Sequence, residues 1–140
     1  DRHLIMNIVT LSLLILCYSL VLGIIFAQVL LTAPVVFKVL DNQNASNFLR
    51  KIFPRYYLLL FLITLIALLV SYLFFQQADV YFALTAVCFS FLGYIIIPLT
   101  NAARDRGWER IFKFFHNFSV LSTLVILVIS ITQIVRVTYL

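Results

Sequence analysis

Charged residues are scarce in this sequence of 140 residues. Asp, Glu, Lys and Arg together make up 11% of it, whereas soluble domains contain about 25%. Hydrophobic residues make up 64%, more apolar side chain than the interior of a single globule of this size can hold. The composition therefore excludes a soluble enzyme, a disordered tail and a secreted disulfide scaffold. It favours a protein whose solvent is a lipid bilayer.

Glycine, cysteine and histidine are also rare. With three glycines the chain has no Gly-rich phosphate loop, and neither an HExxH nor a GxSxG motif occurs. Cys17 and Cys88 form no CxxC pair; buried thiols usually fill apolar space, but a disulfide between these two stays open. His3 and His116 fall on opposite sides of the predicted membrane and cannot share one metal or haem within a monomer. We predict no cofactor, and a haem held by His116 alone stays open.

Long apolar runs dominate what is present. Four of them cover residues of about 4–36, 56–75, 80–97 and 118–135. Each reaches or approaches the ~20 residues that a helix needs to cross a bilayer. The first run is too long for the apolar part of a signal peptide, so we expect it to be a retained span. We predict one domain over residues 1–140, an all-α integral membrane protein built as a four-transmembrane-helix bundle.

The basic residues predict the orientation of the bundle. Eight of the ten Lys and Arg residues lie in the segments 37–55 and 98–117, and the segment 76–79 has none. The positive-inside rule places the two basic loops in the cytoplasm and both termini outside. Anionic lipid headgroups are the expected partners of these loops, and nucleic acid is not expected because the membrane already explains the charge. A homo-oligomer or another membrane partner stays open.

Each basic loop also carries apolar residues at helical spacing. They are Phe48, Leu49, Ile52 and Phe53 in the segment 37–55 and Trp108, Ile111, Phe112 and Phe115 in the segment 98–117. This pattern predicts two short amphipathic helices lying in the membrane interface, with Asn44 or Ser46 as the cap of the first. Pro34 and Pro98 are expected to close the first and third spans.

Small residues predict which spans touch. Ser19, Gly23 and Ala27 share one face of the first span, and Ala83, Ala86, Ser90 and Gly93 share one face of the third. Because small side chains let backbones approach closely in lipid, we expect these two spans to pack along these faces. Gly23→Leu should then destabilise the protein. No charged residue is expected near the middle of any span, which argues against a proton-coupled pump or a voltage sensor.

Polar and amphipathic residues gather where the spans meet the basic loops. The candidate site consists of Gln28, Thr32, Arg55, Tyr56, Tyr57, Asn101, Arg104, His116, Ser119 and Thr123. Such groups at one depth predict a cytoplasm-facing cavity that binds or moves a small molecule, lipid or metal. They equally fit a role in holding loops to helix ends. A haem-linked membrane redox protein using His116 and a structural or lipid-organising subunit stay open. We identify no catalytic residue and expect a non-enzyme.

Several short motifs together resemble a known family. They are GIIF at 23–26, APVVFK at 33–38, IFPRYY at 52–57, PLTNAARD at 98–105 and FHNFS at 115–119. The set resembles a family of small bacterial four-span membrane proteins of unknown function, related to eukaryotic transmembrane protein 205. The residues that match its pattern are Phe53, Pro54, Tyr56, His116 and Ser119. Thr123 stands where the family often has Asn, which puts a role of that amide in doubt. The resemblance implies a four-helix fold in the bacterial inner (plasma) membrane and no particular activity.

Overall fold

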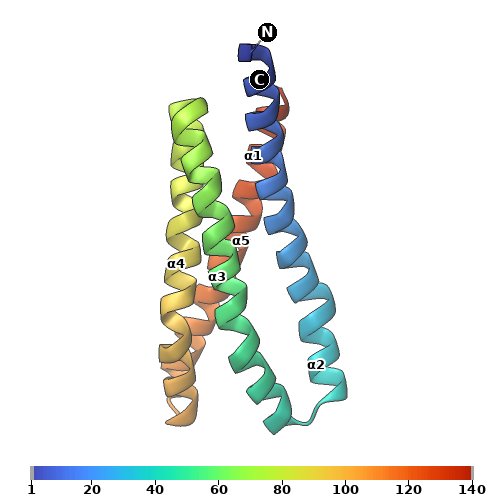
Figure 1. Ribbon diagram of the computed structural model, residues 1–140. Coiled ribbons are helices and arrows are strands. Elements are labelled where there is room, and N and C mark those ends of the chain that lie inside the picture. The colour runs from blue at the N-terminus through green and yellow to red at the C-terminus, as the bar shows by residue number, and fades with distance from the viewer. Residues whose placement is uncertain (1, 140) are drawn as a thin grey trace.

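The structure, a computed structural model, describes residues 2–139 and is helical throughout its main elements (Figure 1). These are α1 (Arg2–Phe26), the π-helix η1 (Ala27–Thr32), α2 (Ala33–Val39), α3 (Asn42–Phe74), α4 (Gln77–Asp105) and α5 (Glu109–Thr138). The first three follow one another without a break, so the chain has four rods long and apolar enough to cross a membrane. The prediction of an all-α four-helix membrane bundle is therefore confirmed, and the protein is a multi-pass membrane protein.

The four rods form a ring in which each helix packs against two others. α1 packs against α3 and α5, and α4 packs against the same two helices from the other side. Among the described residues the backbones of α1 and α4 do not come close to each other, so the predicted packing of the first span on the third along their small residues is wrong. α1 begins and α5 ends at one end of the bundle, as an even number of spans requires (Figure 1).

The small residues explain why this prediction failed. Ser19, Gly23 and Ala27 point outward, and a Cβ on Gly23 would meet nothing within 4 Å. The small face of α4 is buried as expected, but α3 and α5 cover it instead of α1. Cys17 is buried on α1 and Cys88 is exposed on α4, and both thiols are free.

The predicted interfacial helices do not exist as separate elements. Residues 42–55 form the first turns of α3 and residues 109–117 the first turns of α5. The 33 residues of α3 make a rod of about 50 Å, so its basic part extends beyond a hydrocarbon core of about 30 Å. Continuing the rod keeps every backbone hydrogen bond inside one helix, whereas a bend at the interface would expose several of them. The cap of α3 is Asp41, which accepts from the amide N–H of Asn44 at 2.8 Å, and not Asn44 or Ser46.

None of the three prolines ends a helix. Pro54 lies inside α3 and Pro98 inside α4, while Pro34 starts α2 directly after the π-helical segment 27–32. A proline ring clashes with the carbonyl one turn earlier, and a π turn relieves that clash by widening the turn. α4 ends instead at Asp105, two residues before Gly107, whose φ of 69° is the left-handed conformation that glycine adopts readily after a helix. The expected loops at 76–79 and 98–117 are therefore only residues 75–76 and 106–108.

The side chains divide as a bilayer requires. Leu58, Leu62, Leu65 and Leu69 of α3 are exposed apolar residues that face outward. The inside of the ring holds buried aliphatic and aromatic residues together with small hydroxyl residues. Buried Thr64, Ser90 and Ser130 each donate to the carbonyl four residues earlier at 2.8 Å, so their hydroxyls are satisfied within their own helices. This arrangement keeps the polar groups inside and the apolar surface toward lipid.

Candidate functional site

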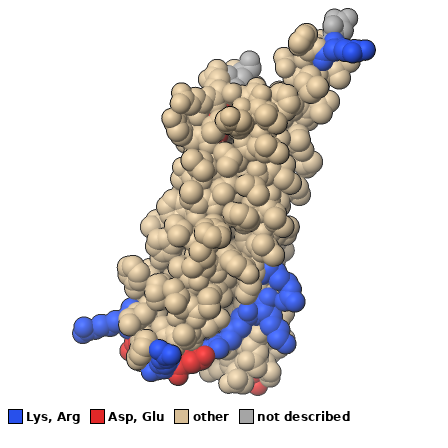
Figure 2. All heavy atoms as spheres, turned by 60° about the vertical axis from the view of Figure 1, so that its left-hand side comes forward, with Lys and Arg blue, Asp and Glu red and all other residues tan. Residues whose placement is uncertain are grey.

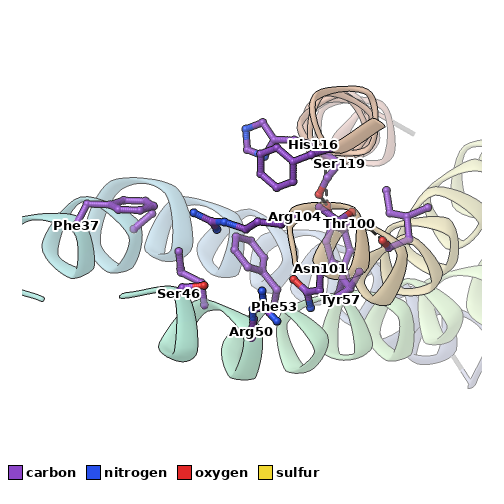
Figure 3. A pocket seen from close by; sticks show the side chains of 15 residues that line it. Phe37, Ser46, Arg50, Phe53, Tyr57, Thr100, Asn101, Arg104, His116 and Ser119 are labelled. Atoms are coloured by element: carbon purple, nitrogen blue, oxygen red, sulfur yellow. Dashed lines mark hydrogen bonds between the residues drawn. The ribbon is translucent and has the colours of Figure 1, made fainter. Parts of the chain in front are cut away.

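A cavity of about 320 Å³ lies at the end of the bundle where the basic residues gather, which we call the basic end (Figure 2, Figure 3). α2 contributes Ala33 and Phe37, and α5 contributes Phe112, His116 and Ser119. The rest of the wall comes from α3 between residues 46 and 57 and from α4 between residues 96 and 104. The long basic turns of α3 and α5 therefore do more than anchor the protein, because they form two walls of this cavity.

The structure brings five of the ten candidate residues into this wall. They are Tyr57, Asn101, Arg104, His116 and Ser119. Tyr56 and Thr123 lie beside the cavity and belong to the same hydrogen-bonded group. The remaining three, Gln28, Thr32 and Arg55, do not line it.

Those three residues have other surroundings. Gln28 is buried in the π-helical segment, and its amide nitrogen has no hydrogen-bond partner among the described residues. Thr32 is half-buried in the same segment. Arg55 is exposed and donates to the carbonyl of Lys51 at 2.8 Å. Helical rotation separates Arg55 from its neighbours Tyr56 and Tyr57, because successive residues point about 100° apart.

A hydrogen-bonded group closes the inner end of the cavity. The Tyr57 hydroxyl lies 2.6 Å from the Ser119 hydroxyl, and it also donates to the Ser119 carbonyl at 3.0 Å. The Thr123 hydroxyl lies 3.3 Å from that of Tyr57 and 3.4 Å from that of Tyr56. These contacts join α3 to α5 across the diagonal of the ring. A buried hydroxyl needs such a partner, so the group both seals the cavity and fixes the distance between the two helices.

The rim of the cavity carries Arg50, Arg104 and His116. Arg50 of α3 is paired with Asp105 of α4 through two hydrogen bonds, one of them 2.9 Å from Nη1 to Oδ2. Both residues lie beyond the apolar part of their helices. The hydrogen bonds from Arg50 lower the pKa of the Asp105 carboxyl below its usual range, and the charge of nearby Arg104 acts in the same direction.

Arg104 and His116 share one aromatic support. The guanidinium carbon of Arg104 lies 5.5 Å from the centre of the Phe112 ring, and the His116 imidazole stacks on the same ring at 5.9 Å. No ion pair joins Arg104 to a carboxylate among residues 2–139. The apolar wall below the rim includes Leu49, Phe53, Ile96 and Ile97. The cavity therefore combines an apolar interior with a rim that carries uncompensated positive charge.

Few side chains that could ligate a metal lie around the cavity in the described part of the chain. No group of three or more His, Cys, Asp or Glu side chains is close enough to hold a metal ion within residues 2–139. His116 is the one imidazole in the cavity wall, and no thiol or thioether of the described residues lines it. A haem at this position would have a single protein ligand.

A second buried polar group was missed from the sequence. Asp79, which falls in the segment 76–79 between the second and third predicted spans, is fully buried in the first turn of α4, with Oδ1 3.5 Å from Nε of Arg136. Buried Tyr18, Ser71 and Gln133 have side-chain atoms without hydrogen-bond partners in the part of the chain that the structure describes, as does Asp79. The available signal was that Asp79 and Arg136, of opposite charge, lie on the same predicted side of the membrane, with Gln133 one turn before Arg136.

Comparison with known proteins gives a family and no activity. Residues 16–109 match the family described as "Domain of unknown function (DUF4149)", more than half of the chain. The chain belongs to this family. The prediction of an uncharacterised family is thereby confirmed, while the relation to transmembrane protein 205 stays a prediction. No curated protein and no solved structure matches the chain significantly. The match ends before His116 and Ser119, so the α5 wall of the cavity lies outside it.

Proposed function

We propose that this DUF4149 member binds an amphiphilic molecule of the membrane in the cavity at the basic end. The observation that carries the proposal is the cavity of about 320 Å³ with apolar residues inside and arginines at its rim. Ligand pockets in proteins measure about 300–1,000 Å³ and are mostly apolar with a few placed polar groups. A molecule with an apolar and a polar part fits both halves of this wall.

The arrangement of α2 and α5 around the cavity supports the proposal that the ligand enters from the bilayer. α1 packs against α5, but among the described residues α2 packs only on α3 and on the adjoining π-helix η1. The cavity lies at the level of α2, where the first rod no longer packs against α5, with Phe37 of α2 on one side and Phe112 of α5 on the other. A lipid can enter sideways through such an opening without leaving the membrane.

The proposal includes the orientation of the protein. We place the basic end on the cytoplasmic side of a bacterial inner membrane, with both termini outside. Its support is the position of eight of the ten Lys and Arg residues in segments 37–55 and 98–117, on the same end of the bundle.

Filling the cavity tests the binding function. Ala33→Trp places a large ring in the wall, whereas Val35→Trp puts the same ring on the outward face of the same helix. Both purified variants are incubated in detergent with dioleoyl phosphatidylglycerol, and native mass spectrometry counts the retained lipid. We expect one retained lipid for the wild type and Val35→Trp and at least a ten-fold smaller lipid-bound fraction for Ala33→Trp. Equal retention in both variants would contradict the proposal and favour a structural subunit.

A further inference from the structure

Two arginines lie at the rim of the cavity, and one of them forms an ion pair within the protein while the other does not. Arg50 and Asp105 form a two-fold hydrogen-bonded pair, which occupies the fork of the Arg50 guanidinium. Arg104 has no ion pair among residues 2–139 and rests on the Phe112 ring. Its N–H groups are thus free to bind a group from outside.

The position of Arg104 suits an anion held at the rim. Figure 3 shows its side chain reaching from α4 across the cavity toward α2, with Phe53 and Phe37 on either side of its end. The Phe112 ring limits the directions that the guanidinium can take, and the stacked His116 adds a second N–H donor nearby. A planar guanidinium presents two parallel N–H groups, which match the two oxygens of a phosphate or a carboxylate.

The charge balance gives the sign of the ligand. Among the lining residues only Arg50 and Arg104 are permanently charged, and the one carboxylate in contact with them, that of Asp105, is engaged by Arg50. A net positive charge therefore remains at the rim. At the depth of a membrane interface the dielectric is lower than in bulk water, so this charge attracts an anion more strongly there than the same charge does in bulk water.

We propose that the cavity selects an anionic membrane lipid, and that Arg104 binds its phosphate or carboxylate group. This inference rests on the proposed binding function and adds the class of ligand. A volume of about 320 Å³ lies at the small end of the usual range for ligand pockets. It encloses a headgroup and the first part of one chain, and the rest of the lipid stays in the bilayer next to α2 and α5.

The test compares two arginine substitutions that remove the same charge from the same turn. Arg104→Gln removes the rim arginine, whereas Arg106→Gln removes one that stacks on Trp108 outside the cavity wall. Each protein is incubated separately with dioleoyl phosphatidylglycerol, oleate, dioleoyl phosphatidylcholine and inorganic phosphate, and adducts are counted by native mass spectrometry. The ratio of phosphatidylglycerol to phosphatidylcholine adducts measures headgroup selection.

We expect the wild type and Arg106→Gln to prefer phosphatidylglycerol about ten-fold, because the choline cation of phosphatidylcholine opposes the attraction between its phosphate and the rim arginine. Arg104→Gln should retain both lipids alike, because the charge that distinguishes them is gone. Binding of oleate that also depends on Arg104 would support recognition of the anionic group. Equal retention of both lipids by the wild type would overturn this inference and leave the binding function standing. No retained lipid at all would overturn both. Binding of inorganic phosphate as tight as that of phosphatidylglycerol would show a free-anion site and overturn the assignment to a lipid.

Discussion

The Tyr57 ring of α3 lies against the backbone of Gly93 on α4, in the space that a side chain on residue 93 would need. A Cβ built on Gly93 would be 2.6 Å from Cδ1 and 2.7 Å from Cζ of that ring. The absence of a side chain at residue 93 is what lets Tyr57 reach Ser119 on α5. The seal of the cavity thus depends on a glycine that does not line it.

Gly93→Ala should destabilise the protein by about 1–3 kcal/mol, because the Tyr57 ring must move away from the new methyl group. Gly23→Ala is the matched control, since a Cβ there meets nothing within 4 Å and alanine favours a helix more than glycine does. Thermal unfolding in detergent, followed by circular dichroism, should show a lower Tm for Gly93→Ala alone. Equal melting temperatures would refute the close approach.

Tyr57→Phe should lower the free energy of unfolding by about 1 kcal/mol, because it removes the hydroxyl bonded to Ser119 and leaves that serine without this partner. Tyr94→Phe, which alters an exposed tyrosine of α4, serves as the control. A double-mutant cycle with Ser119→Ala measures the coupling between the two side chains. A coupling energy near zero would show that the hydrogen bond is not formed in the membrane protein as purified.

Arg136→Gln should destabilise the opposite end of the bundle more than Asp79→Asn does. The first change leaves the buried carboxylate of Asp79 without its cationic neighbour at 3.5 Å, whereas the second removes the buried charge itself. Leaving a buried charge unpaired costs about 3–5 kcal/mol when the pair is fully buried, and less here because Arg136 is only half-buried. The double variant should be more stable than Arg136→Gln alone. Chemical denaturation of the three variants in detergent gives the order, and the reverse order would contradict this assignment.

Asp105→Asn should release Arg50 and increase the selection for anionic lipid. The pair is exposed and screened by solvent, so its loss should leave the stability of the protein nearly unchanged. The rim then has two free guanidinium groups instead of one. The phosphatidylglycerol to phosphatidylcholine ratio of adducts should rise above the wild-type value. An unchanged ratio would mean that Arg50 does not reach the ligand.

Cysteine labelling tests the orientation. In a variant without Cys17 and Cys88, Gln77→Cys places a thiol at the exposed start of α4, and Asn47→Cys places one at the exposed basic end. An impermeant thiol reagent added to intact cells should label residue 77 and reach residue 47 only after lysis. The opposite pattern would invert the proposed orientation.

The four spans were predictable because few backbone structures are stable in the hydrocarbon core of a bilayer. A run of about 20 apolar residues satisfies its backbone there only as a helix, whatever its neighbours are. Tyr57, Asn101, Arg104, His116 and Ser119 were predictable as a group for a related reason, since depth in the membrane follows from distance along a helix. Depth alone cannot tell which way a side chain points, and so it could not separate Gln28, Thr32 and Arg55, which do not line the cavity, from the residues that do.

The order of the helices around the ring was not predictable, because small residues permit close packing but do not specify which helix packs against them. Gly23 and Gly93 look alike in sequence, yet one faces outward and the other receives a tyrosine ring. The ends of the helices also depended on which helices pack together. Pro98 and Asp79 read as loop residues from their neighbours along the chain, but packing against α3 and α5 keeps α4 helical through both. Composition and charge dictated that the chain crosses a membrane four times, whereas contacts between distant residues settled which helices meet and where the cavity lies.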